Sequence, residues 1–310
     1  MLRLVIKKLI QGLLMVLVVA ALTFWLLSRA GGDSLSALRD NPQISAETIE
    51  NLRRVYGLDR PFVERYGNWL GNAMTGDLGE SFSFKVPVGM LVWSRFIKTA
   101  MLACLALAVA ISLSLILAIL VTRYPRSLLS TFVEIIILAT ASTPRMVLAL
   151  LALFLSLHFG LAYPGSAVVT PFQILSIAFV LALPLISAYL AQLRNGLDEA
   201  MSEDFVLLAR AKGLTEWQIV LRHALRPALN PFLTVAGLSL GGLLGGSVIV
   251  EIVLGWPGLG ALMVGAVRAR DVPLVMGVVI ISTIAVWFGN TVAEILQFVN
   301  DKRLRPGVME

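Results

Sequence analysis

Six long apolar runs dominate this sequence and limit what it can fold into. They cover residues 9–27, 99–122, 131–157, 172–193, 231–254 and 274–299. A helix needs about 20 apolar residues to cross a bilayer, and each unpaired backbone group in lipid costs several kcal/mol. We therefore predict an all-α integral membrane protein with six transmembrane helices.

The composition agrees with this fold class. Charged residues make up only 14% of the chain, whereas a soluble domain carries about a quarter. The net charge of +6 could suggest a nucleic-acid partner, but basic residues gathered on cytoplasmic loops give the same value. We expect membrane lipid and no nucleic acid as the surroundings. Cys104 lies within an apolar run, and as the single cysteine it can form no internal disulfide.

Lysine and arginine in the short loops indicate the orientation, because such residues favour the cytoplasmic side. A cytoplasmic N-terminus and C-terminus, in a bacterial-type inner membrane, place most of these basic residues inside. The first apolar run exceeds the roughly 7–15 residues usual in a signal peptide, so we favour an uncleaved span. The cytoplasmic basic residues would then be Arg3, Lys7, Lys8, Arg123, Arg126, Arg194, Arg210, Lys212, Arg222, Arg226, Lys302, Arg303 and Arg305.

The same reading divides the chain into three parts. Residues 1–30 form an N-terminal transmembrane helix, residues 31–98 an extracytoplasmic segment, and residues 99–310 a core of five transmembrane helices. Within the core, residues 194–230 form a polar cytoplasmic segment. In the extracytoplasmic segment we predict two short helices: one capped by Ser45 and stopped at Gly57, the other starting at Pro61 and ending near Gly76. The second helix places Phe62, Tyr66, Trp69, Leu70 and Ala73 on one side.

Residues 202–226 form the most informative polar segment, and we predict a hairpin of two short helices around Gly213. Ser202 is a candidate N-cap, with Glu203 and Asp204 in the first turn, and Thr215 and Gln218 can form a capping box. One interpretation is a loop that only connects two spans. The alternative is a rigid element that a soluble partner binds and moves. The expected apolar faces contain Phe205, Leu208 and Ala209 on the first helix and Trp217, Val220, Leu221 and Ala224 on the second.

The motifs in and around this hairpin resemble a known family. The run from Ala209 to Leu214, followed by Arg222-His223-Ala224-Leu225-Arg226, resembles the cytoplasmic coupling motif of binding-protein-dependent ABC importers. The permeases of dipeptide, oligopeptide and nickel importers are the most similar branch. Further matches are Tyr56-Gly57-Leu58-Asp59-Arg60-Pro61, Gly76-Asp77-Leu78-Gly79-Glu80-Ser81, Trp256-Pro257-Gly258-Leu259-Gly260, and Arg270-Asp271 with Pro273.

The chain departs from the family pattern at a few positions. Leu207 stands where importers in general carry a glutamate, and members of the peptide branch commonly lack that glutamate. Pro227 stands where the branch often has asparagine, and Asn230 where it has an aliphatic residue. The helix that leaves the hairpin is therefore expected to bend differently. Asp301-Lys302-Arg303 replaces a Pro-Arg pair near the C-terminus.

The resemblance implies partners and a mechanism. This chain would form half of a translocation pore together with a second, homologous permease subunit. Two ATPase subunits would bind the hairpins, and an extracytoplasmic solute-binding protein would deliver the solute. ATP and Mg would reside on the ATPases, and we expect no cofactor on this chain, which contains no Gly-x-x-x-x-Gly-Lys-Ser/Thr motif. The implied ATPase-coupling residues are Glu203, Asp204, Ala209, Arg210, Ala211, Lys212, Gly213, Leu214 and Thr215.

Other residues are candidates for the pore or for helix seams. Gly237, Gly241 and Gly245 allow close helix approach, either within this subunit or at the seam with a second permease. Arg145 follows Pro144 near the middle of the third span, where a lipid-facing arginine would be costly. It either bonds to freed carbonyls or another helix, or lines the solute path and contacts a peptide carboxylate. Glu251 either contacts solute or the binding protein, or pairs with a neighbouring loop through Arg268 or Arg270.

The remaining residues argue against enzymatic chemistry. His158 and His223 are the only histidines, and the predicted topology puts them on opposite sides of the membrane. We therefore expect no metal site, and no nucleophile–base pair suggests a membrane-embedded hydrolase. The main alternative function is an ion-coupled secondary transporter that acts without ATPases. That class usually shows inverted repeats and polar residues at broken helices, and no clear repeat is present.

Overall fold

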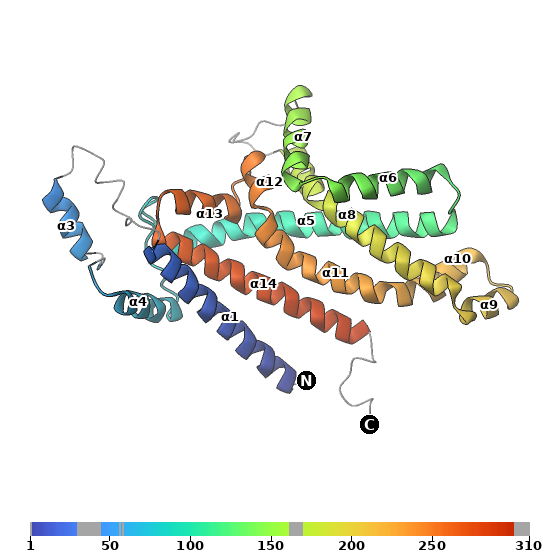
Figure 1. Cartoon of the computed structure of the whole chain (residues 1–310), viewed down its shortest axis with the longest axis horizontal. Helices are drawn as coiled ribbons and strands as arrows, with labels where there is room; N and C mark the ends of the chain where they lie inside the picture. The colour runs from blue at the N-terminus through green and yellow to red at the C-terminus, as the bar shows by residue number, and fades with distance from the viewer. Residues whose placement is uncertain (1, 30–44, 56, 58, 161–169, 301–310) are drawn as a thin grey trace. The chain divides into compact units, whose positions relative to one another are not determined.

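The computed structural model describes residues 2–29, 45–55, 57, 59–160 and 170–300. These residues are almost entirely helical (Figure 1), and they contain no strand beyond one isolated bridge between Glu80 and Pro87. Tyr56, Leu58, Lys302, Arg303, Arg305 and residues 31–44 lie outside the described residues. The helices are α1 Leu2–Arg29, α3 Ala46–Val55, α4 Phe62–Met74, α5 Val88–Arg123, α6 Leu128–Ser142, α7 Arg145–His158, α8 Pro171–Ser202, α9 Asp204–Ala211, α10 Glu216–Ile219, the π-helical η1 Val220–Ala224, α11 Leu225–Gly246, α12 Val248–Val253, α13 Leu259–Arg268 and α14 Val272–Asn300.

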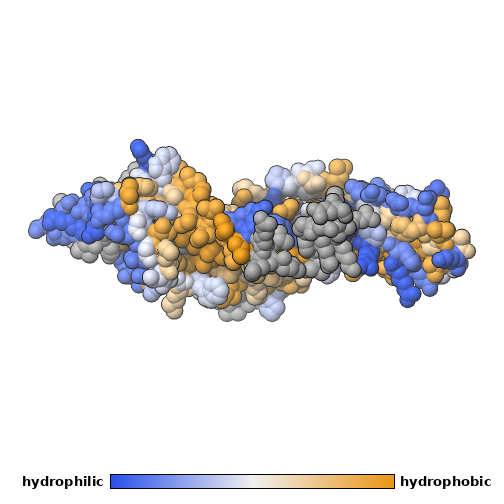
Figure 2. Space-filling view, turned by 90° about the horizontal axis from the view of Figure 1, so that it is seen from below, coloured by the Kyte–Doolittle hydropathy of each residue, from blue (hydrophilic) through white to orange (hydrophobic). Residues whose placement is uncertain are grey.

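Five helical stretches are long and apolar enough to cross a membrane, which confirms a multi-pass membrane protein. A sixth is present if α6 and α7 together count as one span. Wide areas of the surface are apolar, as Figure 2 shows for one face. The five stretches are Ile6–Arg29, Val88–Arg123, Pro171–Ser202, Glu216–Gly246 and Val272–Ile295.

The third predicted span needs correction, because residues 131–157 do not form one continuous helix. The axes of α6 and α7 meet at an angle of 109°. Thr143, between them, has extended backbone angles (φ −99°, ψ 123°), as expected for a residue before proline. Pro144 has no N–H to donate into a continuing helix. Arg145 therefore begins α7 instead of lying in the middle of a helix.

The fifth predicted span also has different limits. Its helix does not begin at Pro231, which lies inside α11. It ends at Gly246, and the separate helix α12 follows after Ser247. The predicted stretch 231–254 thus contains a second helix break.

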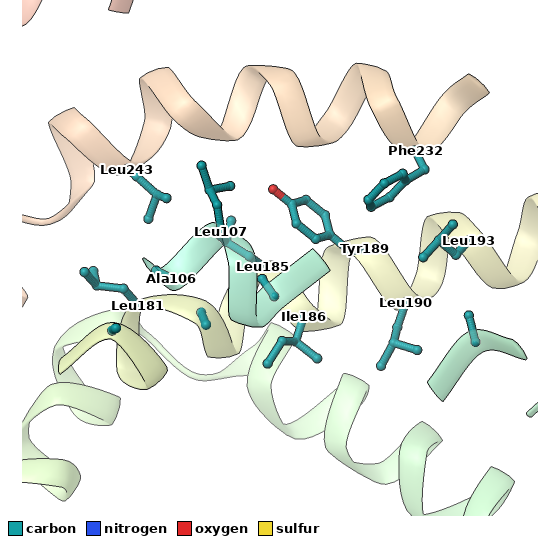
Figure 3. Packing of buried hydrophobic residues seen from close by; sticks show 14 of the residues in the cluster. Ala106, Leu107, Leu181, Leu185, Ile186, Tyr189, Leu190, Leu193, Phe232 and Leu243 are labelled. Carbon is teal, nitrogen blue, oxygen red and sulfur yellow. The ribbon is translucent and has the colours of Figure 1, made fainter. Parts of the chain in front are cut away.

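Contacts between Cα atoms divide the chain into two compact units. Unit 1 contains residues 1–99 and 257–285, and unit 2 contains residues 100–256 and 286–310. Helix α8 is central to unit 2, because many of its side chains along nearly its whole length are buried. Tyr189 of α8 is fully buried, and its ring meets Phe232 of α11 edge to face at 5.2 Å between centroids (Figure 3). Leu181, Leu185 and Leu190 of α8 belong to the same core.

Short polar side chains connect the helices of unit 2. The Ser114 hydroxyl of α5 lies 2.6 Å from the Ala110 carbonyl and 3.3 Å from the Ile186 carbonyl of α8. Thr140 of α6 and Ser187 of α8 are in hydroxyl–hydroxyl contact. Such bonds between membrane helices contribute about 0.6–2 kcal/mol each. They fix the position of α8 against two neighbours without introducing charge.

Helices α11 and α14 pack closely within unit 2 because α11 carries glycines at the contact. A Cβ atom on Gly237 would overlap the Ala293 side chain and lie 3.0 Å from the Ala293 Cα. A Cβ on Gly241 would lie 3.1 Å from Val286 Cγ1 and 3.3 Å from Asn290 Oδ1. Gly245 differs, since a Cβ there would meet no atom within 4 Å. Two of the three glycines therefore face a helix of this same chain.

Aromatic rings attach α4 to α1 in unit 1. Phe24 of α1 is buried, and its ring lies 5.5 Å from both Phe62 and Tyr66 and 6.4 Å from Trp69 of α4, measured between centroids. The Tyr66 hydroxyl donates to the Leu17 carbonyl at 3.4 Å. This cluster confirms that Phe62, Tyr66 and Trp69 lie on one apolar side of α4. The predicted cap of the first is also confirmed, because Ser45 Oγ accepts from the Thr48 N–H at 3.1 Å.

The buried carboxylate of Asp271 ties two distant motifs of unit 1 together. Its Oδ2 accepts from the Ser81 hydroxyl at 2.6 Å and from the Ser83 N–H at 2.9 Å. Its Oδ1 accepts from the Leu274 N–H at 3.2 Å, at the start of α14. Arg270, just before it, has a φ of +54°, an arrangement that costs a non-glycine residue about 1 kcal/mol. The network outweighs this strain and fixes the 80–87 turn to the 269–273 loop.

A second pair of contacts holds the loop that follows Trp256. Arg95 of α5 donates to the Pro257 carbonyl at 3.1 Å. The Thr99 hydroxyl accepts from the Leu259 N–H at 2.7 Å. The first N–H of α13 is thereby satisfied by a side chain of α5, as a buried helix start requires.

Replacing Asp271 with alanine should destabilise unit 1, because three donors would lose one buried acceptor. We expect a loss of about 2–4 kcal/mol and faster proteolysis of the 76–88 segment. Asp77→Ala is the matched control, since Asp77 accepts only one exposed bond, from the Gly79 N–H. Thermal unfolding and limited proteolysis of the detergent-purified chain measure both effects. Equal stability of the two variants would contradict the assigned role of Asp271.

Replacing Gly237 with alanine should force α11 and α14 apart. Overpacking of this kind costs about 1–3 kcal/mol, whereas Gly245→Ala should leave stability unchanged or raise it slightly. Adding Ala293→Gly to Gly237→Ala should restore most of the loss, because it removes the overlapping methyl group. Thermal unfolding of the three variants in detergent is the measurement. Failure of the second substitution to rescue would mean that the strain lies elsewhere.

Candidate functional site

The hairpin of α9 and α10 begins one residue later than its sequence predicts. Glu203 is the N-cap of α9, although its side chain makes no capping bond, and Asp204 lies in the first turn. Ser202 is the last residue of α8 and its hydroxyl donates to the Glu199 carbonyl at 2.7 Å. The prediction of Ser202 as N-cap is therefore wrong, because that hydroxyl completes the preceding helix.

Gly213 produces the turn between the two helices. Its φ is +81°, a region that residues with a Cβ rarely adopt. The Gly213 N–H donates to the Arg210 carbonyl at 2.9 Å, and the Leu214 N–H donates to the Ala209 carbonyl at 3.2 Å. These two bonds form a Schellman motif, which ends α9 and satisfies its last carbonyls.

The predicted capping box at the start of α10 is confirmed. The Thr215 hydroxyl oxygen accepts from the Gln218 N–H at 3.4 Å, and Gln218 Oε1 accepts from the Thr215 N–H at 2.9 Å. Both ends of the turn are therefore closed by local bonds. The turn between the two helices is therefore shaped by bonds within residues 209–218.

An ion pair across the turn adds a connection that sequence analysis missed. The Arg210 guanidinium donates to Glu216 through Nε at 2.8 Å and Nη2 at 3.2 Å. The hydrogen bond and the charge of Glu216 raise the pKa of Arg210 above its usual value. A spacing of six residues is not a helical one, so no periodicity connects the two residues. Gly213 brings them together by reversing the chain.

The hairpin has a small core and exposes apolar side chains on its outside. Val206, Ala209 and Ile219 are buried together, with Phe205 and Leu214 packed against them. Leu207 and Leu208 are 61% and 63% exposed. The prediction that Leu208 shares an apolar face with Ala209 is therefore wrong. Val206 is buried beside Ala209 instead, because it faces Ile219 across the turn. The exposed apolar residues of the hairpin are Leu207, Leu208, Trp217 and Leu221.

The base of the hairpin is firmly attached to unit 2. A Cβ on Gly196 of α8 would lie 3.0 Å from the Ala228 Cα of α11, so the two helix backbones nearly touch. The π-helical turn η1 joins α10 to α11 and buries Val220 and Ala224. Arg194 of α8 contacts Glu134 of α6 at 2.7 Å. A force on the hairpin would therefore act directly on α8 and α11.

The remaining hairpin candidates differ in exposure. Glu203, Asp204, Ala211, Lys212 and Thr215 are exposed, whereas Leu214 is partly buried and Ala209 is buried. Arg222 and His223 are exposed on η1. The structure thus gathers the predicted coupling residues on one small element, with Ala209 and Leu214 in its core.

Arg145 lies at the junction of two helix breaks. It begins α7, and a Cβ on Gly246, the last residue of α11, would overlap its guanidinium. The absence of a side chain at Gly246 therefore lets the cation approach the carboxyl end of α11, where the helix dipole favours positive charge. Arg145 is exposed, and it makes no ion pair within the part of the chain that the structure describes.

Glu251 is fully buried in α12. Its Oε1 accepts from the Ser247 hydroxyl at 2.9 Å, and its backbone carbonyl accepts from the Trp256 N–H at 2.8 Å. Both contacts are within unit 2, at the second helix break and at the loop that follows α12. Glu251 therefore helps to shape the turn into Trp256.

Metal-ligating side chains do not gather anywhere in the described ranges. No group of three or more histidine, cysteine, aspartate or glutamate residues there could hold a metal ion. His158 ends α7 and stacks on Phe154, with 6.0 Å between ring centroids.

Comparison with known proteins identifies the group to which these features belong. Residues 110–306 match the family "Binding-protein-dependent transport system inner membrane component". Residues 1–103 match "Binding-prot-dependent transport system membrane comp, N-term". A crystal structure of an amino acid ABC transporter with histidines has the same fold over 69% of this chain and 94% of its own, with a TM-score of 0.52 and 20% identity.

Curated relatives match over nearly the full length. A protein of Brucella abortus (strain 2308), named for peptide transport, is 35% identical over 97% of this chain and 98% of its own. The oligopeptide transport system permease protein AppB of Bacillus subtilis (strain 168) is 32% identical over 97% of this chain and 98% of its own. The dipeptide transport system permease protein DppB of Lactococcus lactis subsp. cremoris (strain MG1363) is 31% identical over 98% of this chain and 100% of its own.

Between them, the two family matches cover the hairpin and the motifs that begin at Tyr56, Gly76 and Trp256. The apolar helices agree with a multi-pass protein of the inner membrane. The chain belongs to the family of binding-protein-dependent transport system inner membrane components, as a permease subunit of an ABC importer.

Proposed function

We propose that this chain forms half of a gated pore that imports peptides or a related small solute. Relatives named for peptide, oligopeptide and dipeptide transport support this solute class. A second homologous permease supplies the other half of the pore. An extracytoplasmic solute-binding protein delivers the solute, and two ATPase subunits, which bind ATP and Mg, drive the change of access.

The proposed topology has six spans with both termini in the cytoplasm. Helices α6 and α7 count together as the third span. Residues 1–30 form the first span, residues 31–98 the extracytoplasmic segment, and residues 99–310 the core with the coupling segment 194–230. Lysine and arginine in the short loops support this orientation.

The observation that carries the proposal is the shape and attachment of the hairpin. Residues 202–226 present Leu207, Leu208, Trp217 and Leu221 to the outside while a small core and two caps keep the element rigid. Its base is fixed to α8 and α11, where Gly196 and Ala228 nearly touch. When an ATPase binds this apolar surface and moves, the motion is transferred to the two helices that form the centre of unit 2. Burial of apolar side chains contributes about 25 cal/mol per Å² towards binding, from which the entropic cost of association is subtracted.

Valine at position 213 should uncouple the hairpin from its partner. A β-branched residue is strained at φ +81°, although a Cβ would meet no atom within 4 Å, so the defect is confined to the turn. We expect ATP-driven solute uptake to fall about five- to tenfold. Gly213→Asn is the matched control, because asparagine tolerates this conformation.

The measurement is uptake and ATP hydrolysis in vesicles that contain all proposed subunits. Normal uptake by Gly213→Val would contradict the coupling role. Vesicles with this chain as their only protein should accumulate no solute. Accumulation there, driven by an ion gradient, would instead establish the alternative, an ion-coupled secondary transporter.

We further propose that Arg145 lines the solute path and contacts the carboxylate of a peptide, while Gly237, Gly241, Gly245 and Glu251 shape the surrounding helices. The exposed position of Arg145 at two helix breaks supports this role, since broken helices commonly line transport sites. Gly245 is the glycine of the three with open space beside it, so it is available to a second permease.

Arg145→Met should lower uptake of a peptide with a free carboxylate about tenfold, because a charge-assisted hydrogen bond is lost. Uptake of the same peptide with an amidated C-terminus should change little, and Arg145→Lys should retain intermediate activity. Assembly of each variant is confirmed by copurification of the ATPases. If wild type and Arg145→Met took up both peptides equally well, the proposed contact between Arg145 and the peptide carboxylate would be contradicted.

A further inference from the structure

A cavity of about 290 Å³ lies in unit 1 between α1, α4 and the first residues of α14. Its volume is at the small end for ligand pockets, which suits a headgroup or one small group. Polar side chains from α4 and the turn before it, Arg60, Arg65, Asn68 and Asn72, form one part of the wall. Phe24 and Trp69 form an apolar part.

The wall of this cavity is rich in hydrogen-bond donors. Arg60 contacts Glu64 through one Nη atom at 2.9 Å, which leaves other guanidinium N–H groups for a ligand. The Arg65 guanidinium lies 5.7 Å from the centre of the Phe24 ring. None of the residues that line the cavity is acidic. An anion is the ligand that this wall stabilises.

The indole of Trp69 provides the most specific indication. Its Nε1 is buried and has no hydrogen-bond acceptor among the residues that the structure describes. Buried indole N–H groups usually have a partner. The neighbouring Tyr66 shows the normal arrangement, since its hydroxyl donates to the Leu17 carbonyl. An anionic oxygen in the cavity would satisfy the Trp69 donor.

The location of the cavity identifies the source of that anion. Phe24 lies near the end of the span Ile6–Arg29, and Val272 and Pro273, which also line the cavity, begin the span Val272–Ile295. The cavity is therefore at the level where two spans leave the membrane. Phe62, Tyr66 and Trp69 form an aromatic cluster of the kind found at headgroup depth. On its other faces α1 exposes Leu22, Trp25 and Leu26, along which acyl chains can lie.

We propose that this cavity binds the phosphate group of an anionic phospholipid. The guanidinium groups of Arg60 and Arg65 and the Trp69 indole donate to the phosphate oxygens, and the amides of Asn68 and Asn72 bind the remaining polar part of the headgroup. Inorganic phosphate has the same oxygens but no acyl chains. The bound lipid would join α4 to α1 and to the start of α14, which stabilises unit 1 at the membrane surface.

The test is a lipid titration of the purified, delipidated transporter in neutral detergent, read by native mass spectrometry. Phosphatidylglycerol should bind about tenfold more tightly than phosphatidylcholine. The double variant Arg60→Gln and Arg65→Gln should weaken phosphatidylglycerol binding about tenfold, and Trp69→Phe about threefold. Arg54→Gln, which removes an exposed charge of α3 outside the cavity, should bind as wild type.

Each outcome decides the proposal. Equal phosphatidylglycerol binding by wild type, Trp69→Phe and the double variant would overturn it. Displacement of phosphatidylglycerol by millimolar inorganic phosphate would retain the anion site but overturn the lipid as its ligand. Trp69→Phe removes the N–H donor but keeps an aromatic side chain in the cluster, and an unchanged thermal unfolding temperature of this variant shows that a loss of binding is not a loss of folding. Transport measured in parallel separates this result from the proposed pore function, which does not depend on the cavity.

Discussion

The close packing of α8 against α11 is the constraint on which unit 2 depends. Tyr189 and Phe232 fill the space between the two helices, and Gly196 allows their backbones to approach where the hairpin begins. Because α8 is in the middle of the core, α5 and α6 are positioned by their contacts with it. The hairpin is a direct continuation of both helices, so a movement of residues 204–226 cannot be absorbed by a loose connection. This rigidity supports the proposed role of the hairpin, which is to transfer the motion of a partner to α8 and α11.

Two helix breaks bring polar side chains of unit 2 close together. A continuous membrane helix satisfies its own backbone, whereas a break leaves N–H and carbonyl groups that need other partners. In this chain the break at Thr143-Pro144 and the break at Ser247 come together, since Arg145 contacts Gly246. Ser247 and Glu251 complete the second break with a buried hydrogen bond. The two breaks interrupt regular helices, and they place the cation of Arg145 and the carboxylate of Glu251 at defined positions.

In unit 1 the organising element is a set of motifs that are remote in sequence and adjacent in space. Asp271 binds the turn at Ser81, and Arg95 and Thr99 bind the loop after Trp256. Each contact satisfies backbone or hydroxyl groups that would otherwise be buried without a partner. The motifs around Ser81, Trp256 and Asp271 are therefore best understood as one structural network and not as separate binding signatures.

The sequence by itself determined the fold class, the family and the local turns of the hairpin, because these depend on local properties: apolar length, capping residues and glycine turns. The Thr215 capping box and the turn at Gly213 are clear examples. Only the tertiary structure decided which apolar residues of the hairpin are buried, since Val206 replaced Leu208 through contacts across the turn. It also decided the partners of Arg210, Asp271 and Gly237, which lie at spacings that no helical period relates. Such long-range contacts depend on how helices cross, and the crossing is set by the packing of many side chains together.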